Sequence, residues 1–454
     1  MLDFLTAIQE VTAAQTMSVP QVWELQKQRL QTLLEHARSH SPYLKEKYAG
    51  LPDNPDLKEI PYSSRDELMQ NFDRWVCDSE ITFTSATEFI ANIANLTKPY
   101  LGRYKILATS GTTGMPVITV RDAQHNAVNA ALMKVRFWGS EKFRHIQRLE
   151  SQDLRVVGIV AGTYFHSSYL SYQEIKKVYD ARGLSDHLLC LTAQEPVAEM
   201  IQKLNAFRPE VLTGFPSFVY LLAQAQKNGE LNIAPLAICC SAEQLPDMMR
   251  DVIEDAFNAP VMDNYCSTEL GEAAMLQGDN KFHANIDWHI IEPVDDNKNP
   301  VPFGVQGSGA LVTNLANFVQ PIIRYYISDK ITIHDKPANN SPLPVIEIEG
   351  RKEDILEFCK NGKKLTVAPM SLLAIAIHIN GCAATQFIQR KDNLLEIRFS
   401  SVSPDLNEQI GKELLAKIQK FLAENHADFI RTVLSTEPLQ RGKTGKMKYI
   451  FRDV

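Results

Sequence analysis

The segment from residue 109 to residue 114 combines hydroxyl side chains with glycines, a composition that can bind phosphate. Two glycines let the backbone approach a polyanion closely, and four hydroxyl groups can donate hydrogen bonds to phosphate oxygens. The segment is not a Walker loop, because the G-x-x-x-x-G-K-[ST] pattern is absent. Ordinary surface turns are also rich in Gly, Ser and Thr, so both interpretations stay open. The residues are Thr109, Ser110, Gly111, Thr112, Thr113 and Gly114.

A second cluster follows an apolar run, at the expected end of a strand, where α/β folds place ligands. The ring of Tyr265 offers a flat face for a purine, and Thr268 and Glu269 offer hard oxygen ligands for magnesium. A solvated strand-to-helix junction, capped by Ser267 or Thr268, would have the same composition. The cluster comprises Asp263, Asn264, Tyr265, Cys266, Ser267, Thr268 and Glu269.

Three further segments carry charged residues in patterns that are individually weak. Asp329 follows an expected strand, where an Asp can accept hydrogen bonds from both hydroxyls of a ribose, although an ordinary surface Asp is the commoner case. Residues 350–354, which include Arg351 and Glu353, lie at an expected domain boundary. A glycine-spaced basic loop near the C-terminus ends in Lys446, and such a loop is usually a solvated tail.

The composition narrows the class of protein. A length of 454 residues favours two or three domains, and 44% hydrophobic with 22% charged residues is typical of globular proteins. The net charge of −7 argues against nucleic acid as the principal partner. The seven cysteines indicate neither a secreted disulfide framework nor a zinc site. No signal peptide or transmembrane helix is expected, so the sequence predicts a cytoplasmic protein without a membrane partner.

Apolar patterning predicts an α/β body followed by a small α+β domain. Three- and four-residue spacing predicts an opening helix over 21–48. From about residue 105, β-branched runs alternate with amphipathic stretches, which indicates parallel sheet in layered α/β units. The pattern changes at Gly350, so we predict domains over 1–349 and 350–454. The expected strands are 117–120, 156–160, 237–240, 260–263, 310–312, 345–348 and 394–399, and the expected helices are 196–207, 217–228, 368–377 and 404–424.

The order of these segments resembles the acyl-adenylate-forming superfamily, and within it the phenylacetate–coenzyme A ligase-like branch. That family has a Ser/Thr/Gly phosphate loop, an aromatic-x-x-Thr-Glu element, an R-Y-x-x-x-D element, a G-R-x-x-D hinge and a C-terminal G-K lysine. All five occur here in that order, as T-S-G-T-T-G from 109, Y-C-S-T-E from 265, R-Y-Y-I-S-D from 324, G-R-K-E-D from 350 and G-K at 445–446.

The resemblance implies an enzyme that uses ATP and magnesium to convert a carboxylic acid into an acyl-adenylate and pyrophosphate. The acyl group would then pass to a thiol, commonly that of coenzyme A. A small mobile α+β lid, hinged at 350–353 around Glu353, would carry the catalytic Lys446 to the α-phosphate. The resemblance assigns 109–114 to the β- and γ-phosphates, Tyr265 to adenine, Thr268 and Glu269 to magnesium, Asp329 to ribose and Arg351 to ribose or phosphate. Ser241, Ala242 and Glu243 resemble the adenine-contacting loop, and Asp263 and Asn264 are assigned to the nucleotide site.

The acyl pocket is less well defined. Its aromatic character suits an aryl or medium-sized apolar acid, although core packing explains each aromatic residue equally well. Cys266 stands where the family usually has glycine, and we prefer a small buried residue there to a reactive thiol. The residues that fall where the family lines the pocket are Tyr164, Phe165, His166, Phe215 and Cys266.

Two alternatives to a coenzyme A ligase stay open. Residues 357–365 are expected to form an unusually long loop beside the coenzyme A channel, so an amine or a carrier-protein thiol could be the acceptor instead. A non-catalytic nucleotide- or acyl-binding protein is favoured only by Met115, which stands where many members have lysine. The joint presence of Glu269, Asp329 and Lys446 argues against this second alternative.

Overall fold

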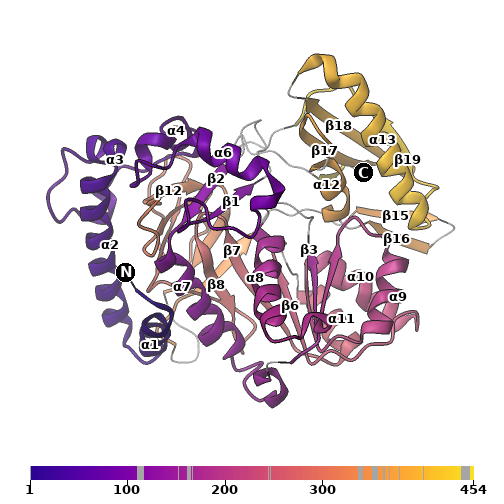
Figure 1. Cartoon of the computed structure of the whole chain (residues 1–454), viewed down its shortest axis with the longest axis horizontal. Helices are drawn as coiled ribbons and strands as arrows, with labels where there is room; N and C mark the ends of the chain where they lie inside the picture. Colours follow the sequence, from indigo (N-terminus) through magenta and orange to yellow (C-terminus); the bar gives the residue numbers. More distant parts are fainter. Residues whose placement is uncertain are drawn as a thin grey trace. The chain divides into compact units, whose positions relative to one another are not determined.

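The chain divides into two compact units, which are described one at a time. The first unit contains Met1–Ala108, Ile118–His145 and Met262–Gly350, and the second contains Thr109–Val117, Ile146–Val261 and Arg351–Val454. The structure is a computed structural model (Figure 1). It describes residues 2–109, 117–151, 153–160, 165, 167–243, 245, 247–335, 341–349, 356–360, 363–367, 369–377, 379–401, 403–440 and 450–453.

The first unit opens with helices, and the opening helix is shorter than predicted. Helix α2 (Val19–His40) begins after Ser18, whose amide donates to the Gln21 side-chain oxygen at 2.8 Å. It ends before Pro42, because the residue preceding a proline avoids the helical conformation. Pro42 then begins a second helix, α3 (Pro42–Lys47), so the single predicted helix is two helices. The other α-helices of this unit are α1 (Phe4–Ala14), α4 (Arg65–Gln70), α5 (Phe72–Trp75), α6 (Phe83–Ala91) and α7 (Ala123–Leu132).

Antiparallel pairing joins most strands of the first unit. The strand order is β13-β14-β9-β8-β7 in one sheet and β10-β11-β12 in a second, and β1 pairs with β2. Strand β7 continues to Ser267, well beyond its predicted end at residue 263. The strands are β1 (Lys105–Thr109), β2 (Val117–Arg121), β7 (Val261–Ser267), β8 (Gly271–Leu276), β9 (Phe282–Ala284), β10 (His289–Val294), β11 (Gly309–Asn314), β12 (Tyr325–Ile327), β13 (Lys330–Ile333) and β14 (Val345–Glu349).

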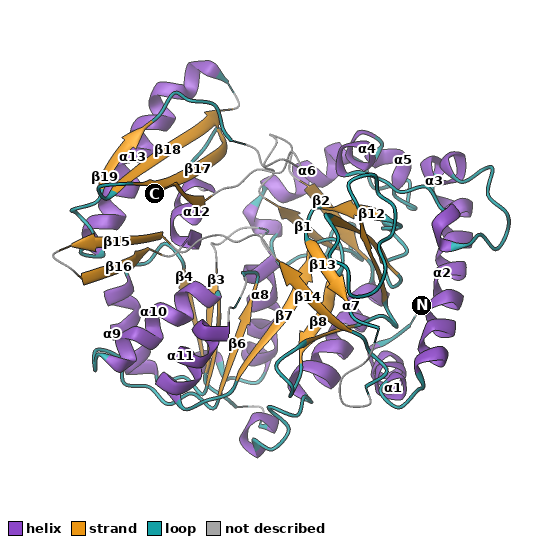
Figure 2. Ribbon diagram, turned by 180° about the vertical axis from the view of Figure 1, so that it is seen from behind, coloured by secondary structure: helices purple, strands orange, loops and turns teal. Residues whose placement is uncertain are grey.

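The second unit contains a parallel sheet with helices on both faces, as the alternating pattern predicts. The order is β6-β5-β3-β4. Helices α9, α10 and α11 share an apolar core with one face (Figure 2). Helix α8 covers the other face, where a Cβ at Gly158 would lie only 2.9 Å from the Tyr172 ring. The elements are β3 (Val156–Val160), α8 (Ser167–Ala181), β4 (Leu188–Thr192), α9 (Val197–Phe207), β5 (Val211–Gly214), α10 (Pro216–Lys227), β6 (Ala237–Ser241) and α11 (Asp247–Phe257).

The C-terminal part of the second unit has a four-stranded sheet of order β19-β18-β17-β20. The described residues of 357–365 lie in strands instead of the predicted loop, because β15 and β16 pair in antiparallel fashion with Lys360 opposite Lys363. The Asn-Gly sequence at 361–362 is typical of two-residue hairpins and was the overlooked signal. The elements are β15 (Leu356–Lys360), β16 (Lys363–Val367), α12 (Pro369–Ile377), β17 (Cys382–Arg390), β18 (Leu394–Ser401), α13 (Asn407–Glu424), β19 (Arg431–Leu434) and β20 (Ile450–Asp453).

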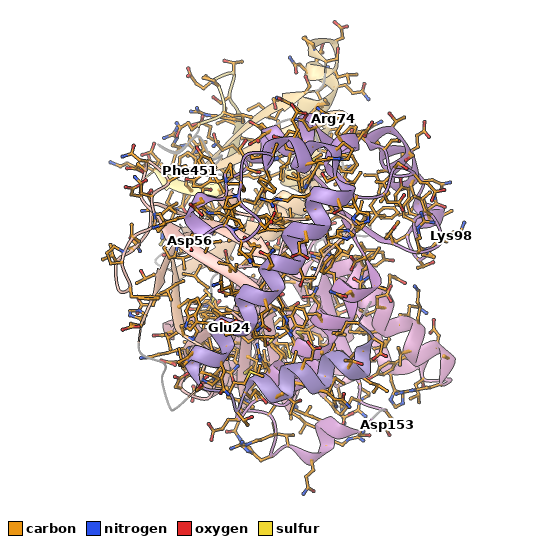
Figure 3. The ribbon with its side chains drawn as sticks, turned by 90° about the vertical axis from the view of Figure 1, so that its left-hand side faces the viewer. Glu24, Asp56, Arg74, Lys98, Asp153 and Phe451 are labelled. Atoms are coloured by element: carbon orange, nitrogen blue, oxygen red, sulfur yellow. The ribbon has the colours of Figure 1, made fainter. Side chains whose placement is uncertain are left out.

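The mixed α/β class is confirmed, whereas the domain limits of 1–349 and 350–454 stay a prediction. Charged side chains lie on the outside of the N-terminal part of the first unit, where Glu24 and Arg74 of the helices and Lys98 of a following bend are exposed (Figure 3). Among the described helices, none combines the length and the apolarity that a membrane crossing requires.

Candidate active site

Tyr265 and Asp329, which are far apart in the sequence, meet in the first unit. Tyr265 lies in β7 and Asp329 between β12 and β13, and the Tyr265 hydroxyl donates a hydrogen bond of 2.7 Å to Asp329 Oδ2. Burial, followed by the negative charge of Asp329, raises the pKa of Tyr265 well above its ordinary value, so the phenol stays protonated. An aromatic ring and an accepting carboxylate therefore lie side by side, a pairing suited to a purine and its ribose.

Thr268 and Glu269 lie in the tight turn between β7 and β8. Gly271 begins β8 with a φ of 75°, in the left-handed region that favours glycine. A Cβ at this position would lie 2.3 Å from Asn129 Oδ1, so the close approach of α7 also requires glycine. Because a strand follows the turn, the strand-to-helix junction considered from the sequence is wrong.

The Glu269 carboxylate lies beside the hydroxyl of Tyr325. Burial, followed by the charge of Glu269, raises the pKa of Tyr325 above its ordinary value. Within the described ranges, no group of three or more His, Cys, Asp and Glu side chains could hold a metal ion by itself. A single carboxylate does fit a magnesium ion that takes its other ligands from nucleotide phosphates and water.

A half-buried polar cluster lies on β7 and β8, where the register of the two strands shifts between Tyr265 and Cys266. Cys266 is paired with Glu272 across the two strands, and Asn264 Nδ2 donates to the Glu272 carboxylate. Burial raises the pKa of Glu272, whereas the hydrogen bond from Asn264 and the charge of Arg121 act to lower it. Burial and then the charge of Glu272 also raise the pKa of the Cys266 thiol. A protonated thiol favours the small buried residue over the reactive nucleophile.

The arginine of the R-Y-x-x-x-D element is structural. Arg324 is buried, and its Nε and Nη2 atoms donate to the two carboxylate oxygens of Glu292, each at 3.0 Å. Its Nη1 atom donates to the carbonyl oxygens of Lys58 and Ile60. Because these contacts occupy the guanidinium group, Arg324 anchors the start of β12, which leads to Asp329.

Two other predicted nucleotide-contacting segments belong to different units. Ser241 ends β6, and Ala242 follows with a φ of 71°, a left-handed conformation that is strained for alanine. Glu243 comes next in the chain. In the first unit, Asp263 is buried in β7, and its Oδ1 atom accepts a hydrogen bond of 2.9 Å from the Asn264 amide. Their roles towards a nucleotide stay predictions.

Two of the predicted pocket residues are buried. Phe165 is buried, and Phe215 belongs to the apolar core of the second unit, which is the core-packing alternative. Thr109 is the last residue of β1. Ser110, Gly111, Thr112, Thr113, Gly114, Tyr164, His166, Arg351, Glu353 and Lys446 lie outside the described residues, and so does the hinge at 350–353.

Sequence reasoning missed the side chains that hold the turn carrying Glu269. Arg121 and Asn314 contact its backbone, and so does Asn129 of α7. His125 lies four residues before Asn129, a spacing that places both on one helix face. Because α7 also carries Gln124 and Asn126, this polar pair is only a weak local signal.

The chain is similar in sequence to two kinds of known protein. It is 23% identical over 434 residues to protein CapK from Staphylococcus aureus, a match that covers 91% of this chain and 87% of CapK. It is 22% identical over 363 residues to phenylacetate-coenzyme A ligase from Pseudomonas putida, which covers 75% of this chain and 73% of that protein. No family model matches the chain.

The fold is that of 2-hydroxyisobutyryl-CoA ligase. The structure of that ligase in complex with 2-HIB-AMP and CoA in the thioesterification state has a TM-score of 0.59 at 18% identity, and covers 97% of this chain and 91% of that one. An open conformation of the ligase gives a TM-score of 0.57. With the phenylacetate–coenzyme A ligase relatives, this fold confirms the predicted resemblance to the acyl-adenylate-forming superfamily, in its phenylacetate–coenzyme A ligase-like branch.

Proposed function

We propose that the protein is an ATP- and magnesium-dependent ligase that activates a carboxylic acid as an acyl-adenylate and then transfers the acyl group to coenzyme A. The observation that carries the proposal is the 2.7 Å hydrogen bond between Tyr265 and Asp329. It joins Tyr265, which is expected at adenine, to Asp329, which is expected at ribose. Tyr265 lies in the strand that leads directly to Glu269. The likeness to phenylacetate-coenzyme A ligases supports the same activity.

Each described residue has a task that its chemistry suits. The ring of Tyr265 stacks on adenine, and Asp329 accepts hydrogen bonds from the ribose hydroxyls. Glu269 binds magnesium with help from Thr268, and the bound ion neutralises charge on the phosphates. The hydroxyl- and glycine-rich segment 109–114 holds the β- and γ-phosphates, which leaves the α-phosphorus facing the acid.

Adenylation forms a bond between a carboxylate oxygen and the α-phosphorus while the bond to pyrophosphate breaks. The Lys446 ammonium group neutralises charge on the α-phosphate and the carboxylate. In the second step the thiol attacks the acyl carbon, loses its proton, and AMP leaves. Residues 350–454 act as a lid that turns on the body of residues 1–349 around Glu353 between the two steps, while Arg351 assists at the ribose or phosphate.

The substrate is proposed to be an aryl or medium-sized apolar acid. The proposal rests on the aromatic residues Tyr164 and Phe165, with His166 and Cys266 at the same pocket, whereas Phe215 packs in the apolar core. Residues 241–243 contact the adenine. Ala242 has a left-handed backbone conformation, which turns the chain directly after β6. We place the protein in the cytoplasm, where ATP and coenzyme A are available together.

Exchange of labelled pyrophosphate into ATP tests the adenylation step. The wild-type protein is incubated with ATP, magnesium and each member of a panel of aromatic and aliphatic acids. We expect exchange with at least one acid and none when the acid or magnesium is omitted. Measurable ATP binding without exchange for any acid would indicate the non-catalytic binding protein instead.

The acceptor is tested next, with the acid that supports exchange. Coenzyme A, simple amines and a carrier protein are added separately, and the acylated products are measured by mass spectrometry. We expect the coenzyme A thioester. An amide or an acylated carrier protein in its place would keep the adenylation step and overturn the choice of acceptor.

A further inference from the structure

The turn between β7 and β8 is held by buried and half-buried side chains instead of by strand pairing alone. Arg121 Nη2, at the end of β2, donates to the carbonyl oxygens of Ser267 at 3.3 Å and Thr268 at 2.8 Å. The Leu270 amide donates to Ser267 Oγ at 3.1 Å. The backbone on both sides of Glu269 is therefore tied down.

Asn314, the last residue of β11, bonds to the next two carbonyl groups of the turn. Its Nδ2 atom donates to the carbonyl oxygens of Glu269 at 3.0 Å and Leu270 at 3.1 Å. Its Oδ1 atom accepts from the Ala316 amide at 3.0 Å, which fixes the orientation of the carboxamide. His289 Nε2 also donates to the Leu270 carbonyl, at 3.0 Å. Every carbonyl group from residue 267 to residue 270 thus accepts a hydrogen bond from a side chain.

Helix α7 completes this arrangement from a third direction. Asn129 Oδ1 accepts from the Glu272 amide at 3.0 Å, and Asn129 Nδ2 lies 2.6 Å from His125 Nε2. The other ring nitrogen of His125 lies 3.1 Å from Asn314 Nδ2. A neutral imidazole can accept a hydrogen bond from one of these two amide groups, whereas a protonated ring could accept from neither, so the surroundings favour the neutral form. Burial, followed by the charge of Arg121, lowers the pKa of His125 well below its ordinary value.

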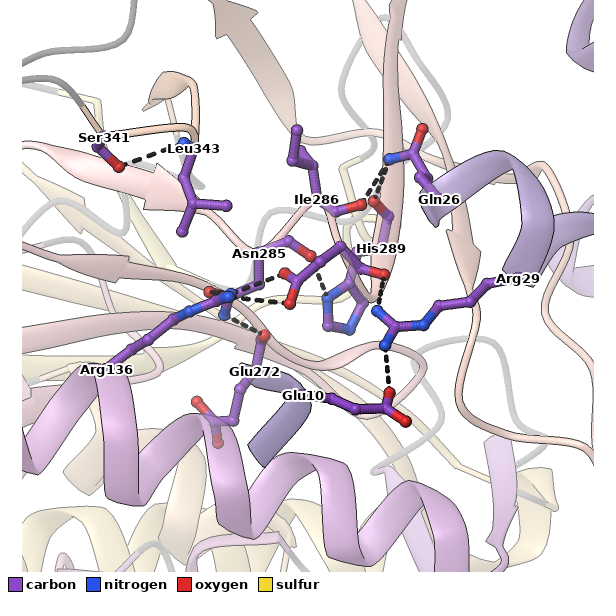
Figure 4. A network of polar contacts seen from close by, with 11 residues as sticks. Glu10, Gln26, Arg29, Arg136, Glu272, Asn285, Ile286, His289, Ser341 and Leu343 are labelled. Carbon is purple, nitrogen blue, oxygen red and sulfur yellow. Dashed lines mark hydrogen bonds and ion pairs between the residues drawn. The ribbon is translucent and has the colours of Figure 1, made fainter. Parts of the chain in front are cut away.

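A deeper layer of polar contacts supports the start of β8. Figure 4 shows Asn285, whose Nδ2 atom donates to the Glu272 carbonyl at 2.7 Å and whose Oδ1 atom accepts from Arg136 at 2.8 Å. Arg136 also forms a paired contact with Asp287, at 2.7 and 2.8 Å. The turn therefore rests on a fully buried ion pair, which limits its movement.

We propose that Arg121, His125, Asn129 and Asn314 are positioning residues that hold the Glu269 carboxylate where the magnesium ion of the ATP complex is bound. Burying this many polar groups is costly unless each is paired, and a two-stranded connection needs no such support. The contacts converge on the backbone around Glu269. This inference rests on the proposed function. It adds residues that act through the turn and not on the substrate.

Asn314 and Asn317 form a matched pair for the test. Both are buried, at 0% and 1% exposure, and both donate through Nδ2 to two carbonyl groups. Asn317 bonds to the backbone of Val120, Asp122 and Gln320 and not to residues 267–272, so Asn317→Ala controls for the general cost of removing a buried amide.

Two measurements on the full-length variants read out the position of the turn. Hydrogen–deuterium exchange follows the amides of residues 264–276, and electron paramagnetic resonance of free Mn²⁺ gives its Kd in the presence of ATP. We expect Asn314→Ala to speed exchange in this segment and to weaken Mn²⁺ binding by about 10- to 100-fold, as loss of an outer-shell partner does. Asn317→Ala should leave both close to wild type.

Equal weakening of Mn²⁺ binding by both variants, or unchanged binding in Asn314→Ala, would overturn the positioning role. If Asn314→Ala does not fold, Asn129→Ala replaces it, since that variant loses the bond to the Glu272 amide and the contact with His125. The proposed function fails separately. Wild-type protein without acid-dependent pyrophosphate exchange would refute the ligase, whereas the Mn²⁺ measurements on the same protein would still decide the positioning role.

Discussion

The parallel-sheet segment Ile146–Val261 and the first unit bury different kinds of side chain. In the parallel-sheet segment Ile146–Val261, the described core is an apolar cluster in which Leu222 and Ile253 are fully buried. Among the described residues of that segment, Arg250 alone is a buried charged or polar residue. The first unit instead buries ion pairs, including Arg136 with Asp287.

This difference separates scaffold from site. Apolar burial builds a stable layer without directional constraints, whereas a buried polar network stabilises only when each partner is in place. The network of the first unit surrounds the turn that carries Glu269 and includes the anchor of the strand before Asp329. Burial of charged and polar side chains is costly, and the buried network of the first unit is therefore the part that orients the proposed nucleotide-binding groups.

Removing one partner of the buried ion pair should have the largest effect on stability. Asp287→Ala leaves the Arg136 guanidinium group buried without its partner, so the free energy of unfolding should fall by about 3 to 5 kcal/mol. Urea unfolding measures the loss. Arg74→Ala, which breaks an exposed pair with Glu46, is the control. Equal losses of stability in the two variants would contradict the importance of buried ion pairs in the first unit.

A cavity in the apolar core should cost slightly less and should not depend on pH. Leu222 is fully buried in the second unit, and Leu222→Ala should lower the free energy of unfolding by about 2 to 5 kcal/mol. Unfolding curves at pH 5 and pH 7 should give the same loss, because this cluster contains no His, Asp or Glu side chain. A loss that changes between the two pH values would show that polar groups also determine this core.

The neutral His125 should make stability fall as the pH is lowered. An unfolded histidine titrates near pH 6.5, but the pKa of His125 in the folded protein is lowered well below that value. Between the two pKa values the unfolded state binds a proton that the folded state does not. The slope from this residue is therefore up to about 1.4 kcal/mol per pH unit, with stability rising towards higher pH.

The variant His125→Gln isolates this slope. The pKa of His289 is also lowered by burial, but His289 is present in both proteins and cancels in the comparison. Urea unfolding between pH 5 and pH 7 should give a shallower dependence for His125→Gln than for wild type. Parallel curves for the two proteins would mean that His125 does not stay neutral in the folded state.

The smallest expected effect concerns the Tyr265 hydroxyl. Tyr265→Phe removes the hydrogen bond to Asp329 and keeps the ring, so ATP binding should weaken by no more than about 1 kcal/mol. Tyr265→Ala also removes the ring and should weaken binding by about 1 to 3 kcal/mol more. Calorimetric titration with ATP measures both. Equal affinities for the Phe and Ala variants would show that the Tyr265 ring does not stack on adenine.

Local pattern predicted the parallel-sheet scaffold well and the neighbourhood of the site less well. The apolar run at 156–160 is strand β3 with the predicted limits, because a buried parallel strand is apolar on both faces. Strand β7 runs past residue 263 through polar residues, since cross-strand partners such as Glu272 satisfy them. Asn314 bonds to residues more than 40 positions away, and no local pattern encodes such a contact.

The most direct test of the proposed chemistry follows the label from ATP in a single turnover. Wild-type protein in excess over ATP labelled at the α-phosphate is mixed with magnesium and the acid that supports pyrophosphate exchange, and the products are separated by chromatography. We expect the label to appear in an acyl-adenylate and to move to AMP when coenzyme A is added. Label in ADP, with the acid recovered as an acyl phosphate, would contradict this expectation.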